Sequence, residues 1–128
     1  MQYSIIKQKS YDFALQIIKL HQLLRREKHF EISAQLIKSA TSIGANVEEA
    51  LAGQSRKDFV AKMSIASKEA REANYWLRLI RDSALLPGNH VEVLVVDSEE
   101  LIKILTSIVK TSSAKMIETK NYELKTKN

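Results

Sequence analysis

Apolar residues recur at every third or fourth position in four separate stretches of the chain. This spacing places them on one face of an α-helix, which is then buried against neighbouring helices. The pattern predicts helices over about residues 10–28, 32–52 and 90–117, and another that begins at Ser55. Although VEVLVV has strand-like propensity, the helical spacing continues beyond it and favours a helix.

Polar segments separate the four stretches. The segment REKHFE ends the first helix, and Gly53 ends the second. Ser55 and Asp58 match a capping box, in which the hydroxyl and the carboxylate each accept a free N–H. Pro87 and Gly88 stop the third helix. Four amphipathic helices with short connections predict an all-α fold, an antiparallel up-down-up-down four-helix bundle.

The length of the chain, 128 residues, suits one compact domain. We place this bundle domain at residues 1–118. The last ten residues, TKNYELKTKN, have little apolar content, so residues 119–128 are predicted to form a mobile basic tail. One proline and three glycines favour long helices over a β fold with many turns.

The composition of the chain limits the cellular compartment and the kinds of partner that we expect for it. The chain has no cysteine, which excludes disulfides and thiolate metal sites. The N-terminus lacks the apolar core of a signal peptide, and no apolar run approaches the roughly 18 residues of a membrane span. We therefore expect a cytoplasmic protein with no membrane partner. The net charge of +5 and the pI of about 9.5 permit binding to nucleic acid, although they also aid solubility.

The sequence offers no recognisable pattern for catalysis or metal binding. The acidic residues of the second and third helices lack the Glu-x-x-His spacing of di-iron bundles. His21, His29 and His90 are scattered, and no Ser–His–acid set can be placed. The glycines are isolated, so there is no phosphate-binding loop. We expect no enzyme, and we assign no catalytic residue, metal ligand or cofactor.

A row of polar residues runs beside the apolar face of the second helix. Ser39, Ser42, Asn46 and Glu49 fall three and four residues apart and share one edge. We favour a structural polar seam, in which they hydrogen-bond across to the third helix and Asn46 fixes the register. Glu69 on the third helix is placed in the same seam. A ligand or nucleic-acid contact is the alternative.

The third helix has apolar residues on two sides. Besides its core stripe, one flank holds Glu72, Tyr75, Trp76 and Leu79. The aromatic residues either cap the core of their own chain or lie in a contact between subunits. We favour an oligomer interface, because a single bundle needs only one apolar stripe per helix and aromatic residues are enriched in interfaces.

The opposite flank of the third helix is basic. Arg71, Arg78 and Arg81 form a row, and with Lys62 they are the candidate nucleic-acid contacts, since guanidinium groups suit phosphates. The alternative is a solvated face or ion pairs between subunits. Lysines of the tail would strengthen nonspecific binding by releasing counterions.

One long motif carries a family resemblance. The segment QLIKSATSIGANVEEALAGQSRKDFVAKMSIASKEAREANYWLRLI resembles the four-helix-bundle proteins encoded in intervening sequences of bacterial 23S rRNA genes. Their pattern runs Gln, small-Ser-Ile-x-x-Asn-Ile/Val-x-Glu, a Ser-x-x-Asp-Phe turn, and small-Ser-x-x-Glu. The matching positions here are Gln35, Ser42, Ile43, Asn46, Val47, Glu49, Ser55, Asp58, Phe59 and Glu69.

The resemblance implies more than the residues do. It implies a left-handed bundle that assembles into a homopentameric ring. Related bundles are accessory proteins of diversity-generating retroelements, which bind nucleic acid and a reverse transcriptase. The partners it suggests are further copies of the chain, RNA or DNA, and a reverse transcriptase. The alternative is a purely structural or protein-binding oligomer without direct nucleic-acid contact.

Overall fold

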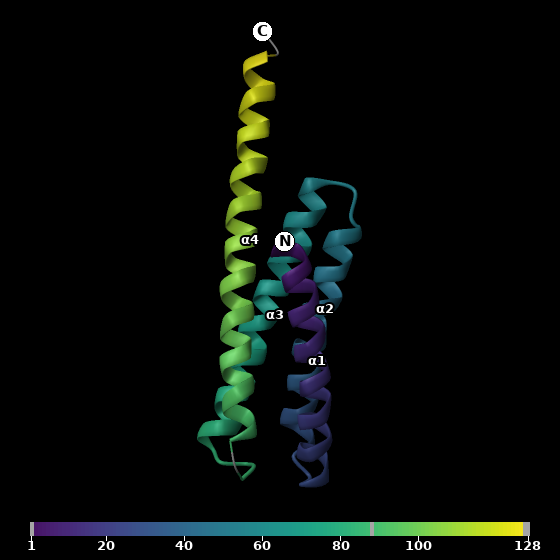
Figure 1. Ribbon diagram of the computed structural model, residues 1–128, viewed down its shortest axis with the longest axis vertical. Coiled ribbons are helices and arrows are strands. Elements are labelled where there is room, and N and C mark those ends of the chain that lie inside the picture. The colour runs from purple at the N-terminus through teal and green to yellow at the C-terminus, as the bar shows by residue number, and fades with distance from the viewer. Residues whose placement is uncertain (1, 88, 127–128) are drawn as a thin grey trace.

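The structure, a computed structural model, describes residues 2–87 and 89–126. Over these residues the chain forms four helices and no strand, which confirms the prediction of an all-α four-helix bundle (Figure 1). Gly88, expected to help stop the third helix, lies outside the described residues. The helices are α1 (Gln2–Arg26), α2 (Phe30–Ala52), α3 (Arg56–Asp82) and α4 (His90–Thr126).

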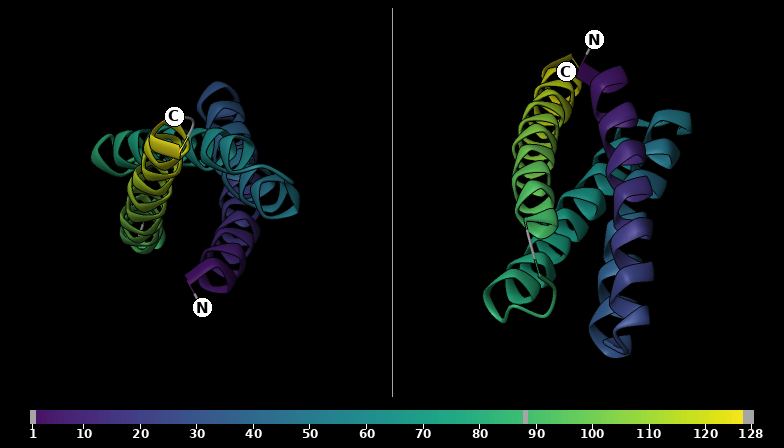
Figure 2. Two further views of the ribbon diagram at one scale, coloured as in Figure 1. Left: turned by 90° about the horizontal axis from the view of Figure 1, so that it is seen from above. Right: turned by 60° about the horizontal axis from the view of Figure 1, so that its bottom comes forward.

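The chain reverses direction at each of its three connections (Figure 1). Consecutive helices pack side by side, and α4 returns to contact α1. The diagonal helices α1 and α3 come together at one end of the bundle, where the rings of Tyr3 and Phe59 lie with centroids 5.3 Å apart. The contact between α1 and α4 is the least extensive of the four. Seen from above, these two helices lie well apart (Figure 2), so the bundle is most open along this pair. The left-handed twist stays a prediction.

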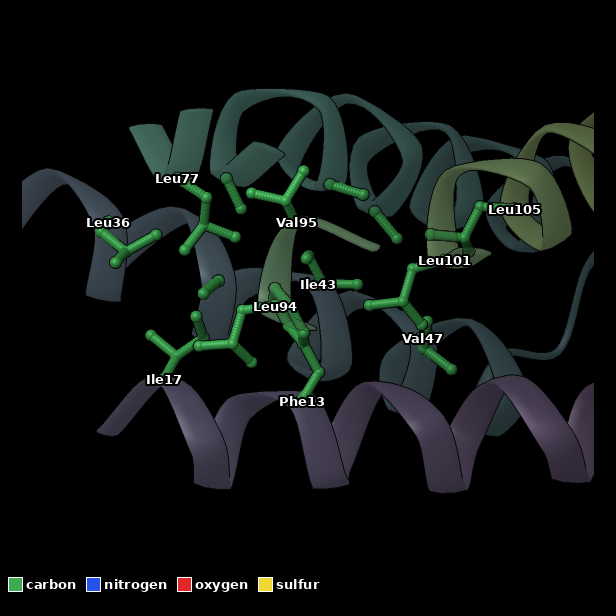
Figure 3. Close-up of a cluster of buried hydrophobic side chains, with 14 of the residues drawn as sticks. Phe13, Ile17, Leu36, Ile43, Val47, Leu77, Leu94, Val95, Leu101 and Leu105 are labelled. Carbon is green, nitrogen blue, oxygen red and sulfur yellow. The ribbon is translucent and has the colours of Figure 1, made fainter. Parts of the chain in front are cut away.

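The core is built from the predicted stripes. Side chains from all four helices meet in it (Figure 3). Ala66, Ala70 and Ala73 are fully buried in the middle of α3, where their small side chains let neighbouring helices approach closely. Ile18 lies outside this core although it is apolar: it follows the fully buried Ile17 and therefore points about 100° away from it, and its side chain is exposed.

The connection between α2 and α3 follows the predicted signals with one change. The Oγ atom of Ser55 accepts the backbone N–H of Asp58 at 3.0 Å, which is one of the two bonds of the predicted capping box. Within the described residues no bond from the N–H of Ser55 to the Asp58 carboxylate is recorded. Gly53 ends α2, but its φ of −67° is not left-handed. Its missing side chain matters for space instead, because a Cβ atom there would lie 2.5 Å from the carboxylate oxygen Oδ2 of Asp58.

The other two connections use left-handed residues that are not glycine. Lys28 follows α1 with φ 66°, and Ala84 follows α3 with φ 54°. After α3, the N–H of Ala84 donates to the carbonyl of Arg81 and the N–H of Leu85 to that of Ile80. This pairing is a Schellman motif, which satisfies the last carbonyls of the helix.

Helix α4 is longer than the sequence pattern indicated. Its prediction ended at about residue 117, yet the helix continues to Thr126 and extends beyond the other three helices (Figure 1). Helical backbone there does not depend on core contacts, since the segment is rich in good helix formers such as Lys and Glu. The domain boundary at residue 118 and the mobility of the tail stay predictions.

None of the four helices, over the part of the chain that the structure describes, is sufficiently long and apolar to cross a membrane.

Candidate interaction surfaces

Two of the predicted basic residues reach from α3 to α4. The Nη2 atom of Arg71 donates to the hydroxyl of Thr106 at 3.0 Å. The Nη1 atom of Arg81 donates to Glu92 at 3.1 Å, and its Nε atom donates to the carboxylate of Asp82 at 2.8 Å. The bonds to Asp82 first, and to Glu92 second, raise the pKa of Arg81. The charge of Arg81 is therefore largely balanced within the chain.

Arg78, between them, belongs to a buried network. Its Nε atom donates to the side-chain oxygen of Asn74 at 2.8 Å. The amide of Asn74 donates in turn to the hydroxyl of Ser98 at 2.9 Å, and Ser98 donates to the carbonyl of Val95. Asn74 is only 8% exposed, and Ser98 is fully buried. This network is the polar link that fixes α3 against α4.

Neither Asn74 nor Ser98 was predicted as a functional or structural site from the sequence. A signal was present, however. The apolar stripe of α4 has Val95 and Leu101 but a serine between them, at a position that the helical spacing puts in the core. A buried hydroxyl needs a partner, so a polar residue on a facing helix was to be expected.

Lys62 is not part of the same surface. Its ammonium lies 3.5 Å from the carboxylate of Glu49 on α2. Nine residues separate it from Arg71, which on a helix corresponds to half a rotation. The structure therefore brings together Arg71, Arg78 and Arg81 but leaves Lys62 on the α2 side of α3.

The predicted polar seam is local to α2. Ser39 and Ser42 donate to carbonyls one turn earlier, and Asn46 donates to the carbonyl of Ser42 at 2.8 Å. The structure records no hydrogen bond from these three to α3 within the described residues. Such short polar side chains compete well for their own helix's carbonyls. Of the predicted seam on α2, only Glu49 reaches α3, through Lys62.

Glu69, the seam residue on α3, lies in a partly buried position. Burial first, and the Glu72 carboxylate second, raise its pKa, against the opposing effect of Lys38 and Lys68. No ion pair shorter than 4.0 Å is recorded for Glu69 within the described residues. The carboxylate is thus destabilised in the isolated chain.

The flank predicted as an oligomer interface is exposed and apolar. Tyr75 is 47% exposed and Leu79 39%, while Trp76 is partly buried against the core. The rings of Tyr75 and Trp76 contact edge to face, with centroids 5.2 Å apart. The indole N–H of Trp76 is buried and has no hydrogen-bond partner within residues 2–87 and 89–126. Glu72 lies exposed beside them.

A second outward apolar row lies on α1 and was not predicted. Tyr11, Leu15 and Ile18 are exposed and are spaced four and three residues apart, so they share one face of the helix. Because α1 and α3 are diagonal in the bundle, the two rows lie on separate sides of the molecule.

No group of three or more acidic, histidine or cysteine side chains that could hold a metal ion occurs within the described part of the chain.

The fold and these surfaces define an all-α bundle domain with charged and apolar rows on its outer faces. The chain belongs to the 23S rRNA-intervening sequence protein family, whose sequence model matches residues 2–107. This confirms the family resemblance drawn from the central motif. A comparison with curated proteins found no match.

A solved structure supports the fold. The chain is 42% identical to a protein of unknown function from the S23 ribosomal protein family of Bacteroides thetaiotaomicron VPI-5482, with a TM-score of 0.81. The likeness covers 86% of this chain and 99% of that one. The family match ends at residue 107, so the last part of α4 lies beyond it.

Proposed function

We propose that this chain is a non-enzymatic bundle that self-assembles into a ring and binds nucleic acid through a basic surface. The absence of acid–base and metal-ligand patterns from the sequence supports a non-enzymatic role. A cysteine-free chain also suits the cytoplasm, where we place it.

The outward apolar flank of α3 is the observation that carries self-assembly. Tyr75 and Leu79 expose apolar side chains there, and a neighbouring molecule would remove this apolar area from water. The row of Tyr11, Leu15 and Ile18 on α1 offers a different apolar face. A contact between two different faces is heterologous, and repeated contacts of this kind form a ring when the rotation between successive copies closes. The family resemblance suggests five copies.

Light scattering coupled to size-exclusion chromatography tests the assembly. We expect the native chain to have about five times the monomer mass of 14.6 kDa. Leu79→Asp and Leu15→Asp should each abolish the five-copy ring, because both place a charge in an apolar contact while leaving the core intact. Val96→Asp, at an exposed position outside both rows, should leave the mass unchanged. A monomeric native protein at high micromolar concentration would contradict the proposal.

The basic row carries the nucleic-acid part of the proposal. Arg71 and Arg78 have no carboxylate within 4.0 Å in the described part of the chain, so their charge is available to phosphates. Arg81 contributes less, since two carboxylates already hold it. Lys62 acts apart from the row.

Fluorescence anisotropy with a labelled single-stranded RNA and a DNA duplex tests this binding. Affinity should fall steeply between 50 and 200 mM salt, by about one power of salt concentration per phosphate contact. Arg71→Gln should weaken binding and lower that salt slope by about one. Lys103→Gln also removes one positive charge, but from α4 and outside the row on α3, so it should have a smaller effect. No binding at low salt would reject the nucleic-acid role.

A purely structural or protein-binding oligomer, for example an accessory to a reverse transcriptase, is the second candidate. It is favoured by the engagement of the row's donors with Thr106, Asn74 and Glu92. Persistent assembly without nucleic-acid binding would support it.

A further inference from the structure

The C-terminal part of α4 forms an arm whose side chains are exposed from residue 117 onward. We use "arm" for residues 115–126, which extend beyond the other three helices (Figure 1). Ile117 is 58% exposed, and Leu124 is 65% exposed. With Lys120 they are spaced three and four residues apart, so all three share one face of the helix. The arm therefore presents two apolar side chains with a positive charge between them.

Charge divides α4 into two unlike parts. Residues 90–100 contain four acidic residues and no lysine or arginine. Residues 101–126 contain five lysines and two glutamates. This order suits the helix dipole, but it also makes one end of the helix electrostatically complementary to the other end in a second copy.

A groove lies where the acidic part of α4 faces α1. It encloses about 600 Å³, and its lining includes Leu20, Leu23, His90, Val93, Leu94 and Asp97. The hollow continues along the same pair of helices, since Gln16 and Asp97 also line a neighbouring one with Lys9, Phe13 and Glu100. Of the helix pairs in contact, α1 and α4 have the least extensive contact, which agrees with a groove between them.

Asp97 is the carboxylate that lies between the two hollows. Burial first, and the neighbouring Glu100 second, raise its pKa, which Lys9 opposes. Lys9 is bonded to Glu100 at 2.8 Å, and Asp97 has no ion pair of its own within the described residues. The groove thus combines an apolar lining with an acidic group that a cation would stabilise.

Length and position restrict the possible occupant. The arm of twelve residues is about 18 Å long, and the groove from Lys9 to Leu23 follows about 21 Å of α1. The arm cannot reach the groove of its own chain, because 23 residues of continuous helix, about 35 Å, separate Leu94 from Ile117. Only a second copy can bring the two together.

We propose that the arm of one chain packs into the groove between α1 and α4 of a second copy. Ile117 and Leu124 contact the apolar lining, and Lys120 pairs with Asp97. The contact uses neither the flank of α3 nor the outward row of α1. It is therefore separate from the proposed ring contact, and each contact is testable while the other is disrupted.

Cysteine cross-linking tests the contact directly, since the native chain has no cysteine. Val93 is 61% exposed, so Val93→Cys and Leu124→Cys both leave the core intact. An oxidised mixture of the two single variants should yield at least ten times more mixed dimer than a mixture of Leu124→Cys with Phe30→Cys, an exposed control at the start of α2 that lies outside the groove and both apolar rows. Equal yields would overturn the proposal. Repeating the mixture in the Leu79→Asp background separates this contact from the ring.

Exchanging the charges tests the assigned pair. Lys120→Asp should reduce the mixed dimer several-fold, and adding Asp97→Lys should restore it, because the pair is then reversed. If Lys120→Asp instead leaves the cross-link unchanged and only weakens binding to a labelled RNA, the arm is a nucleic-acid contact and the proposal is wrong.

Discussion

Helix α4 meets its two neighbours in different ways. Against α3 it is joined by polar contacts at three levels: Arg81 with Glu92, Asn74 with Ser98, and Arg71 with Thr106. Against α1 the structure records one ion pair within the described residues, that of Lys9 with Glu100, beside a groove. We call the hydrogen-bonded contact of α4 with α3 the closed seam and its contact with α1 the open seam. The open seam leaves side chains of both helices available to a partner.

The largest expected effect tests whether side chains at the bottom of the groove between α1 and α4 are packed in the core. Leu101 lines the groove between α1 and α4, yet it is only 1% exposed. Leu101→Ala should lower the free energy of unfolding by about 2–5 kcal/mol, as buried leucine truncations do. Leu105→Ala, with a fully buried leucine one turn further, is the reference, and urea denaturation measures both. A loss of unfolding free energy below 1 kcal/mol for Leu101→Ala would mean that Leu101 is not packed in the core.

The next effect concerns the polar link of the closed seam. Asn74→Ala leaves the buried hydroxyl of Ser98 without its donor and releases Arg78, so we expect a loss of about 1–3 kcal/mol in urea denaturation. Lys9→Ala removes the ion pair of the open seam and should cost much less, since that pair is exposed. Similar losses would remove the contrast between the two seams.

A substitution in the connection between α3 and α4 should increase the stability of the protein. Ala84 adopts φ 54° between α3 and α4, where glycine avoids the steric cost of a side chain. We expect Ala84→Gly to raise the free energy of unfolding by about 0.5–1 kcal/mol. Ser83→Gly is the neighbouring control: with φ −87° the native residue is unstrained and its hydroxyl donates to the carbonyl of Leu79, so glycine there should destabilise through added flexibility and the lost bond. Thermal denaturation of both variants distinguishes strain from general flexibility.

The smallest effect depends on pH and belongs to the open seam. The pKa of Asp97 is raised by burial, so the folded chain holds its proton more tightly than the unfolded chain does. The stability gained from the protonated Asp97 carboxyl is thus fully present below the unfolded pKa of about 3.9, and it is lost as the pH rises through the folded pKa. Asp97→Asn should therefore stabilise the isolated chain slightly at pH 7 and lose this advantage near pH 3.5.

Urea denaturation at the two pH values measures this effect in the Leu124→Asp background, which prevents docking of the arm. A stabilisation that persists unchanged at pH 3.5 would show that the charge of Asp97 is not its cause.

Much of the fold could be predicted from the sequence. The periodic apolar positions identified all four helices, and the central motif identified the family. Helix ends were less accurate, because α1 begins eight residues earlier and α4 ends nine residues later than predicted. The last turns of α4 have few core contacts and therefore leave little apolar periodicity in the sequence. The first turns of α1 place Ile6 in the core, but the residues around it are largely polar or exposed.

The candidate surfaces were predicted less completely. The row of Arg71, Arg78 and Arg81 followed from spacing within one helix, whereas Lys62 was grouped with it although it faces α2. The polar residues predicted along α2 lie on one edge of that helix. Asn46 was expected to bond across to α3, but it donates to a carbonyl of its own helix. Each of these differences concerns which of several possible partners a polar side chain selects.

The sequence by itself determined the four helices, their buried faces and the family, since these depend on spacing along one helix. Only the tertiary structure decided that Asn74 meets Ser98, that Glu49 finds Lys62, and that α1 and α4 enclose a groove. The physical reason is that the rotation and register of one helix against another depend on all the contacts of the core at once. A polar side chain gains a partner only after that arrangement is set.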